Sequence, residues 1–239
     1  MDPARRDRYL KALGIESWQL REPVATRPEA ATDVPVAEPA RIAEPVVALT
    51  AGVPSDWDGL QAAVASCRKC RLCETRTNTV FGVGPRQAPL MVVGEGPGAD
   101  EDAQGEPFVG RAGRLLDEML RAIGRSRQTN TFIANVVKCR PPGNREPAED
   151  EAEACRAYLE QQLRMVRPKL IVAVGRVAAQ RLLVTDTPIG KMRGQNYSWG
   201  PEATPLMVTY HPAYLLRNPG DKAKSWEDLK RVHRFLGGA

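Results

Sequence analysis

The sequence lacks any apolar run long enough to span a bilayer, which excludes a transmembrane protein. Its first residues, Met1-Asp2-Pro3-Ala4-Arg5-Arg6, lead into an amphipathic segment, whereas a secretory signal would continue into an apolar core. Without an export signal, the five cysteines are expected to be reduced thiols that bind metal rather than disulfide partners. We therefore expect a cytoplasmic protein that does not associate with membranes.

Glycine is absent from residues 21–51, where Ala, Pro, Val, Thr and Glu dominate. Such a segment cannot bury enough apolar surface to offset its ordering entropy, so residues 21–54 are predicted to be a disordered linker. Residues 1–20 are predicted to contain a short helix, and they are a candidate docking segment for a partner that the sequence does not identify. Residues 55–239 are long enough for one domain with a sizeable core, since 42% of the chain is hydrophobic.

Within residues 55–239, short apolar runs alternate with segments of helical periodicity. Strands are predicted at residues 90–93, 131–137, 170–174, 195–199 and 206–209. Helices are predicted at residues 55–66, 112–123, 149–166, 176–183 and 225–236. Continuous apolar strands between helices are typical of an α/β fold with a mostly parallel sheet covered on both faces. Ligands of such sheets bind at the carboxyl ends of the strands, so chemistry is expected in the loops that follow them.

The glycine-rich turn at residues 94–98 follows the first predicted strand, but it lacks the lysine and hydroxyl residue of a phosphate-binding P-loop. The dinucleotide-binding pattern is absent too, because the turn continues into a long acidic loop that would repel phosphate. One interpretation is a tight turn with a solvated acidic tip. The other is a backbone that approaches a neutral planar ligand, with a carboxylate available to position water.

Two further loops carry polar side chains at the ends of predicted strands. Asn135 interrupts the apolar strand at 131–137, and a buried amide needs hydrogen-bond partners. His211, one of two histidines, follows the strand at 206–209. Either residue alone is more often structural than functional. A parallel sheet, however, is expected to bring both to the edge that also holds the glycine-rich turn.

Four of the cysteines form two separated pairs: Cys67 and Cys70 in C-x2-C spacing, and Cys139 and Cys155 further along the chain. Thiolates that converge from distant segments bind metal, and four of them complete a closed site. An iron–sulfur cluster and a structural zinc ion both fit this ligand set, and the thiolates alone do not separate the two.

Taken together, these segments resemble the iron–sulfur (family 4) uracil-DNA glycosylases of the uracil-DNA glycosylase superfamily. The resemblance covers about residues 60–236 and rests on Cys67–Cys70, residues 94–98, 107–110 and 135–142, Cys155 and residues 211–217. It implies a three-layer α/β/α sandwich and one [4Fe–4S] cluster held by Cys67, Cys70, Cys139 and Cys155. Cys73 is left over and could compete as a ligand in a C-x2-C-x2-C run, although Cys155 would then lack a purpose.

The resemblance also implies hydrolysis of the bond between uracil and deoxyribose in DNA, after the nucleotide has rotated out of the duplex into a pocket. Phe108 would stack on the extruded base. Asn135 would distinguish uracil from cytosine, because its amide can donate to O4 and accept from N3–H. Glu101 would exclude the methyl group of thymine.

Bond cleavage would build negative charge on the base and positive charge on the sugar. His211, together with backbone N–H groups near Gly96, would stabilise the departing base. Asp102, ranked ahead of Glu95, would orient the attacking water or stabilise the cationic sugar.

The net charge of +5, from 34 Lys and Arg against 29 Asp and Glu, fits a polyanionic partner. The residues expected to contact DNA phosphates are Lys138, Arg140, Arg145, Lys191, Arg193 and Arg217. Leu215 and Leu216 are expected to wedge into the gap left by the flipped nucleotide. The expected partner is uracil-containing DNA, single- or double-stranded, bound by a monomer. Two alternatives are a relative that binds uracil-DNA covalently and a non-catalytic, cluster-bearing DNA-binding module.

Overall fold

The computed structural model describes residues 52–237, so the expectations for residues 1–20 and for most of the linker lie outside the described residues. The strands are β1 (Leu90–Gly94), β2 (Thr131–Asn135), β3 (Leu170–Val174), β4 (Tyr197–Trp199) and β5 (Thr204–Thr209). The α-helices are α2 (Trp57–Ala65), α3 (Ala99–Gln104), α4 (Arg111–Arg121), α5 (Glu149–Val166), α6 (Arg176–Leu183), α7 (Ile189–Met192), α8 (Pro212–Arg217) and α9 (Lys222–Phe235). Short 3-10 turns are η2 (Arg71–Glu74), η3 (Pro142–Asn144) and η4 (Pro219–Asp221).

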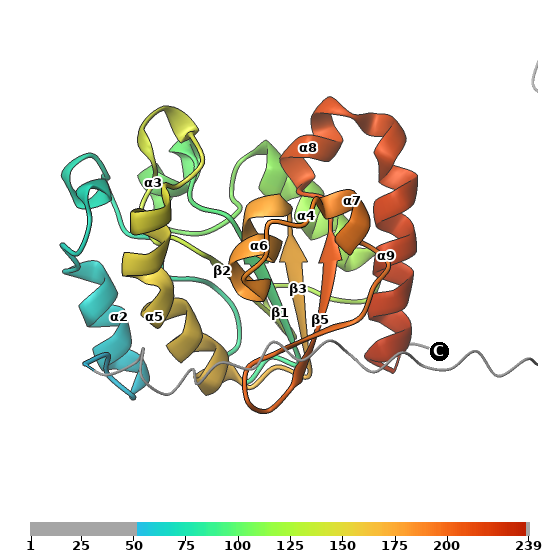
Figure 1. Cartoon of the computed structure of the whole chain (residues 1–239), viewed down its shortest axis with the longest axis horizontal. Helices are drawn as coiled ribbons and strands as arrows, with labels where there is room; N and C mark the ends of the chain where they lie inside the picture. The colour runs from blue at the N-terminus through green and yellow to red at the C-terminus, as the bar shows by residue number, and fades with distance from the viewer. Residues whose placement is uncertain (1–51, 238–239) are drawn as a thin grey trace, which may run out of the picture. The chain divides into compact units, whose positions relative to one another are not determined.

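The five strands form one sheet in the order β2-β1-β3-β5-β4. β1 pairs in parallel with both β2 and β3, and β3 pairs in parallel with β5, whereas β4 runs antiparallel along β5. The parallel register places Gly94 of β1 beside Asn135 of β2. The carboxyl ends of the parallel strands therefore meet along one edge of the sheet, as the arrows of Figure 1 show.

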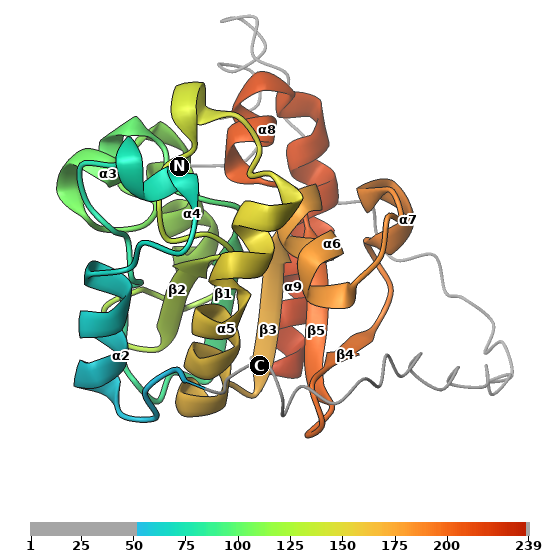
Figure 2. The same ribbon diagram turned by 60° about the vertical axis from the view of Figure 1, so that its left-hand side comes forward.

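Two hydrophobic layers cover the sheet, and alternate residues of each strand enter opposite layers. In β3, Ile171 and Ala173 face the layer that contains α2, α5 and α6. Leu170, Val172 and Val174 face the layer built with α4, α8 and α9. Figures 1 and 2 show these two helix groups on either side of the strands. The predicted α/β class, with a mostly parallel sheet between helical layers, is confirmed.

The predicted bounds of three elements, α5, β3 and α6, match the structure residue for residue. The helices α3 and α8 lie in segments that were interpreted as loops. The first has three acidic residues in one turn and hence no apolar stripe, and the second is only six residues long. Both helices begin shortly after the carboxyl end of a strand, α3 after β1 and α8 after β5, which is where a ligand is expected to bind.

The folded part begins before the predicted boundary at residue 55. Val53 already packs against the core beside α2, so the folded part includes the last residues of the predicted linker.

No helix among residues 52–237 is long and apolar enough to cross a membrane.

Candidate active site at the carboxyl ends of the strands

A cavity of about 470 Å³ opens at the carboxyl edge of the sheet. It brings together eight of the residues expected to act on the base or the DNA: Glu95, Gly96, Glu101, Phe108, Asn135, Arg145, His211 and Arg217. These residues come from the loops after β1, β2 and β5 and from the segments around α3, η3 and α8. The shared strand edge thus assembles side chains that are more than a hundred residues apart in sequence.

Asn135, the last residue of β2, is 1% exposed, and its Oδ1 atom has no hydrogen-bond partner among the described residues. A Cβ atom at Gly94 would lie 2.5 Å from that Oδ1 atom and 2.5 Å from the ring of Phe108. Glycine at this position therefore lets the amide and the aromatic ring approach each other. An unpaired buried amide oxygen costs about 1–3 kcal/mol, which a ligand N–H group could recover.

His211 precedes α8, and its Nδ1 atom accepts a hydrogen bond of 3.1 Å from the backbone N–H of Ala213. Burial, together with the nearby positive charge of Arg217 and against the opposing charge of Glu101, lowers the pKa of His211 to about 4. The ring is therefore neutral at pH 7. Because Nδ1 accepts, the proton of the neutral ring lies on Nε2, which leaves His211 as a hydrogen-bond donor to the cavity that it lines.

Phe108 lies 5.6 Å from the ring of His211, centroid to centroid, with the planes tilted by 32°. Its side chain is 6% exposed and its φ is +56°, a left-handed conformation that is unusual for a bulky residue. Such strain costs on the order of 1–3 kcal/mol and persists only where the surroundings impose it.

Glu101 holds the turn that follows Phe108. Its Oε1 atom accepts hydrogen bonds from the N–H groups of Val109 (3.0 Å) and Gly110 (3.1 Å), and its Oε2 atom accepts one from Gly98 (3.1 Å). Glu101 therefore joins the glycine-rich turn to the aromatic wall of the cavity, besides lining the cavity itself.

Glu95 follows β1 and lines the same cavity. The pKa of Glu95 is raised to about 7, first by burial and then by the negative charge of Glu146, against the opposing positive charge of Arg176. At neutral pH the carboxyl group therefore exchanges between its protonated and ionised forms.

The backbone at Gly96 lies close to the side chain of Val137. A Cβ atom at residue 96 would lie 2.8 Å from a methyl group of Val137, so this position favours glycine.

Asp102 does not line the cavity, and its expected role in orienting water is wrong. Its side chain is 4% exposed, and its carboxylate accepts hydrogen bonds from the backbone N–H groups of Thr77 (2.8 Å) and Asn78 (3.3 Å). The residue lies in α3, which turns it away from the strand ends and toward the preceding loop. Among the two carboxylates considered for this role, Glu95 remains.

Three of the expected DNA contacts are also corrected. Lys138 is 1% exposed, and its Nζ atom donates to the backbone O of Asn135 (2.8 Å) and to Gln162 (2.6 Å). Arg193 is bound to Asp228 with its side chain only 12% exposed. Leu215 is 1% exposed and packs in the core. Each was assigned from its place in a loop motif, which does not reveal the direction of a side chain.

The other expected DNA contacts remain accessible. Arg217, Lys191 and Leu216 are exposed, and Arg140 is half-buried. Arg145 is exposed too, although both Nη atoms donate to the carboxylate of Glu151 at 2.7 Å. The sequence interpretation missed Glu146, which lines the cavity and raises the pKa of Glu95. A single carboxylate in a loop carries no pattern that would have identified it.

All five cysteines line one second cavity on the α2–α5 side of the sheet, together with Arg76 and Tyr158. Arg76 donates a hydrogen bond to the Sγ atom of Cys139 (3.0 Å), and the backbone N–H of Lys138 donates to Cys155 (3.3 Å). Burial raises the pKa of the Cys155 thiol to about 12. Within residues 52–237, no three His, Cys, Asp or Glu side chains are gathered closely enough to bind a single metal ion.

The fold and the cavities define an α/β protein with a candidate ligand site at the strand ends and a second, cysteine-lined cavity. The sequence of this chain matches the family model of the uracil DNA glycosylase superfamily over residues 81–230. Type-4 uracil-DNA glycosylases of Archaeoglobus fulgidus, Sulfurisphaera tokodaii and Thermotoga maritima are 43%, 43% and 42% identical to this chain. The alignments cover 75%, 74% and 72% of this chain and 93%, 83% and 91% of the relatives, respectively. The chain belongs to the uracil-DNA glycosylase superfamily and, within it, to the type-4 enzymes.

Proposed function

We propose that this protein hydrolyses the N-glycosidic bond of uracil in DNA, and so begins its repair by leaving an abasic site. The observation that carries the proposal is the unpaired Oδ1 atom of Asn135 in a cavity that also holds Phe108 and His211. The relatives are uracil-DNA glycosylases by name, and they cover nearly three quarters of this chain.

Recognition of uracil follows from the amide of Asn135. Its Oδ1 atom accepts a hydrogen bond from N3–H of uracil, and its Nδ2 atom donates to O4. Cytosine presents an unprotonated N3 and an amino group at these positions, so both contacts become mismatched. Each unpaired polar group costs about 1–3 kcal/mol, which gives strong discrimination against a base that the cell must not excise.

Cleavage depends on stabilising the departing base. His211 donates from Nε2 to O2 of uracil, where negative charge develops as the glycosidic bond breaks. A neutral donor suits this task because it needs no proton transfer to act. Phe108 stacks on the base and holds its plane against the amide and the imidazole.

Glu95 acts on the sugar side of the bond. In its ionised form it orients a water molecule toward C1′ and stabilises the positive charge on the sugar. Its carboxylate is available only in part at neutral pH, because its pKa is about 7.

The DNA backbone is bound by the exposed Arg217 and Arg145, which line the cavity, and by the half-buried Arg140 and the exposed Lys191 outside it. Contacts of this kind carry little sequence preference, so affinity falls as salt concentration rises. Leu216 is the exposed apolar residue beside Arg217 and fills the gap left by the extruded nucleotide.

A [4Fe–4S] cluster is proposed for the cysteine-lined cavity, with Cys67, Cys70, Cys139 and Cys155 as ligands. The five cysteines line one cavity, yet no three His, Cys, Asp or Glu side chains among the described residues could hold a single metal ion. This suits a multi-iron cluster better than one zinc ion, whose thiolate sulfurs lie about 2.3 Å from the metal. The bonds from Arg76 and from the Lys138 backbone to Cys139 and Cys155 suit bound thiolates. When bound, the cluster serves as a structural brace, and the chain's own residues carry out the excision.

The cluster is tested by elemental analysis and site-directed variants. The purified protein is expected to be brown, with an absorbance band at about 400 nm. It is also expected to contain about four iron atoms per chain. Cys155→Ser is expected to lose iron and Cys73→Ser to retain it. Stoichiometric zinc in a colourless protein would contradict the proposal.

The activity is tested with an oligonucleotide that contains a single uracil, single-stranded or paired with guanine. The protein alone is expected to generate alkali-labile abasic sites in both substrates and none in the matching cytosine oligonucleotide. No alkali-labile sites after prolonged incubation with the brown protein would overturn the proposed function. A trapped protein–DNA adduct in place of released uracil would favour the covalent alternative.

A further inference from the structure

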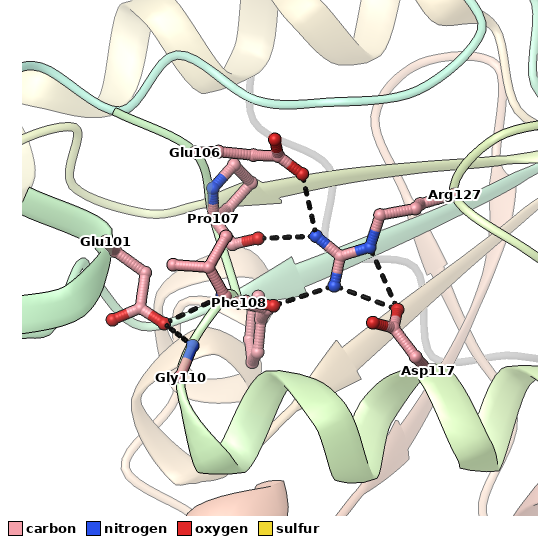
Figure 3. Close-up of polar contacts among 8 residues, drawn as sticks. Glu101, Glu106, Pro107, Phe108, Gly110, Asp117 and Arg127 are labelled. Atoms are coloured by element: carbon pink, nitrogen blue, oxygen red, sulfur yellow. Dashed lines mark hydrogen bonds and ion pairs between the residues drawn. The ribbon is translucent and has the colours of Figure 1, made fainter. Parts of the chain in front are cut away.

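We propose that Arg127 is a positioning residue for uracil excision, acting by holding the Phe108 turn in its base-stacking conformation. The inference rests on the proposed function and adds a residue from outside every motif that carries the family resemblance. Figure 3 shows the arrangement: the guanidinium of Arg127 lies between the carbonyl groups of the turn and two carboxylates.

Arg127 uses all three of its nitrogen atoms. Nη1 donates to the backbone O of Pro107 (2.8 Å) and Nη2 donates to the backbone O of Phe108 (2.7 Å). Nε donates to Asp117 (2.9 Å) of α4, and Nη1 also reaches Glu106 (3.1 Å). The Arg127 side chain is only 7% exposed, so these bonds are not weakened by competing water. The planar fork of arginine matches two adjacent carbonyl groups, which a lysine cannot do.

The turn needs such a clamp because Phe108 has a φ of +56°. A phenylalanine does not favour this conformation by itself, so the neighbouring structure must impose it. Arg127 binds the carbonyl groups on one side of the turn, and Glu101 binds the amides of Val109 and Gly110 on the other. The two side chains together fix the peptide groups on both sides of Phe108.

The position of the turn sets the position of the ring. The Phe108 ring fits over Gly94, where a Cβ atom would lie 2.5 Å from it, and 5.6 Å from the ring of His211. A ring displaced from this place would no longer hold the base flat against Asn135 and His211. Misplacement by about 1 Å can lower a rate on the order of 10²-fold.

The test is a double-mutant cycle on the rate of uracil excision, measured under single-turnover conditions with enzyme in excess. Arg127→Met is expected to slow excision by ~10-fold to ~100-fold and to weaken inhibition by free uracil. Affinity for a uracil-free duplex is expected to be unchanged. In a Phe108→Ala background the same substitution is expected to change the rate by less than about twofold, because residues that act through one another are not additive.

Arg156→Met is the matched control. Arg156 also forms ion pairs with two carboxylates, Glu153 and Glu160, but it lies outside the uracil cavity. Asp117→Ala is a milder variant that removes one hydrogen-bond acceptor of the guanidinium, the Oδ1 atom of Asp117. It is expected to slow excision in the same direction, which keeps the test usable if Arg127→Met does not fold. Melting temperatures are recorded for every variant.

The outcomes separate the two proposals. A wild-type protein that releases no uracil would overturn the proposed function. An active wild type would overturn the positioning role if Arg127→Met slowed excision no more than Arg156→Met, or if its effect persisted in the Phe108→Ala background. If Arg127→Met did not fold, a rate for Asp117→Ala equal to that of wild type would overturn the role as well.

Discussion

Asn135 and His211 are each held in place by a hydrogen bond. In both residues the bonded atom differs from the atoms that are proposed to bind uracil. The backbone O of Asn135 accepts from the buried ammonium of Lys138, and Nδ1 of His211 accepts from the N–H of Ala213. The Oδ1 atom of Asn135 has no partner among the described residues, and Nε2 of His211 carries the proton of the neutral ring. At the scale of the residue, the proposed selectivity and leaving-group stabilisation thus use polar atoms other than those that hold the two residues in place.

Asn135→Asp is expected to relax discrimination between uracil and cytosine. A carboxyl group can accept from the amino group of cytosine and, when protonated, donate to its bare N3. Loss of a matched amide contact, at about 1–3 kcal/mol, should slow uracil release by roughly 5-fold to 150-fold, while cytosine release becomes detectable. The measurement is the ratio of single-turnover rates on uracil and cytosine oligonucleotides. Asn196→Asp, an exposed residue outside the cavity, is the control, and an unchanged ratio in Asn135→Asp would remove Asn135 from its role.

Glu95 is expected to give the excision rate a pH dependence with a midpoint near its pKa of about 7. Burial raises this pKa, so below pH 7 the carboxyl group is protonated and cannot support the cationic sugar. The rate should therefore rise with pH through about 7 and level off above it. His211 adds no second step between pH 5 and 9, because its pKa is about 4. Glu95→Gln is expected to be slow and to lose the rise.

Glu146→Gln supplies the matched control for this pH dependence. The negative charge of Glu146 raises the pKa of Glu95, so its removal should shift the rising limb to lower pH while the rate at high pH is retained. The measurement is the single-turnover rate from pH 5 to 9 for each variant. A midpoint that does not move in Glu146→Gln, or a rise that persists in Glu95→Gln, would assign the titration to another group.

At the scale of the element, the strands and the longer helices were predictable, and the six-residue helices α3 and α8 were not. The apolar residues of β3 form a short continuous run and those of α5 recur at helical spacing, so the bounds of both elements follow from the pattern of apolar residues. α3 and α8 are six residues each and are stabilised by their place in the fold. Asp102 was expected at the strand ends because α3 was not foreseen, and it does not line the cavity; His211 follows a strand directly and does line it.

Gly113, in the first turn of α4, allows the helix to touch the Phe108 turn. A Cβ atom at this position would lie 1.8 Å from the backbone O of Phe108, a distance that no relaxation of a side chain can relieve. Gly113→Ala is therefore expected to destabilise the fold by roughly 1–3 kcal/mol and to slow excision by displacing Phe108. Gly190→Ala in α7 is the control, since nothing lies within 4 Å of its Cβ position. Urea unfolding curves that are equal for the two variants would contradict this account.

At the scale of the whole molecule, the uracil cavity and the cysteine cavity are joined by one segment of chain. β2 ends at Asn135, and Cys139 follows four residues later on the other side of Lys138. Lys138 is fixed at both ends. Its backbone N–H donates a hydrogen bond to the Sγ atom of Cys155, and its Nζ atom donates to the backbone O of Asn135 and to Oε1 of Gln162. The four-residue spacing was visible in the sequence, but the buried lysine that links the two sites was not, because a lysine in a basic loop predicts an exposed side chain.

Removal of residues 1–51 is expected to leave uracil excision unchanged on both single-stranded and duplex DNA. The residues that line the uracil cavity all lie between 95 and 217, and the cysteines lie between 67 and 155. The deletion retains Val53 and the buried Leu60 and Val64 of α2, which pack in the core. A longer deletion to residue 66 removes that packing and is expected to lower the melting temperature sharply. The measurements are kcat/KM and melting temperature for the full chain and both truncations. A shorter truncation that melts like the full chain but has lost activity would contradict this expectation and show that residues 1–51 contribute to excision.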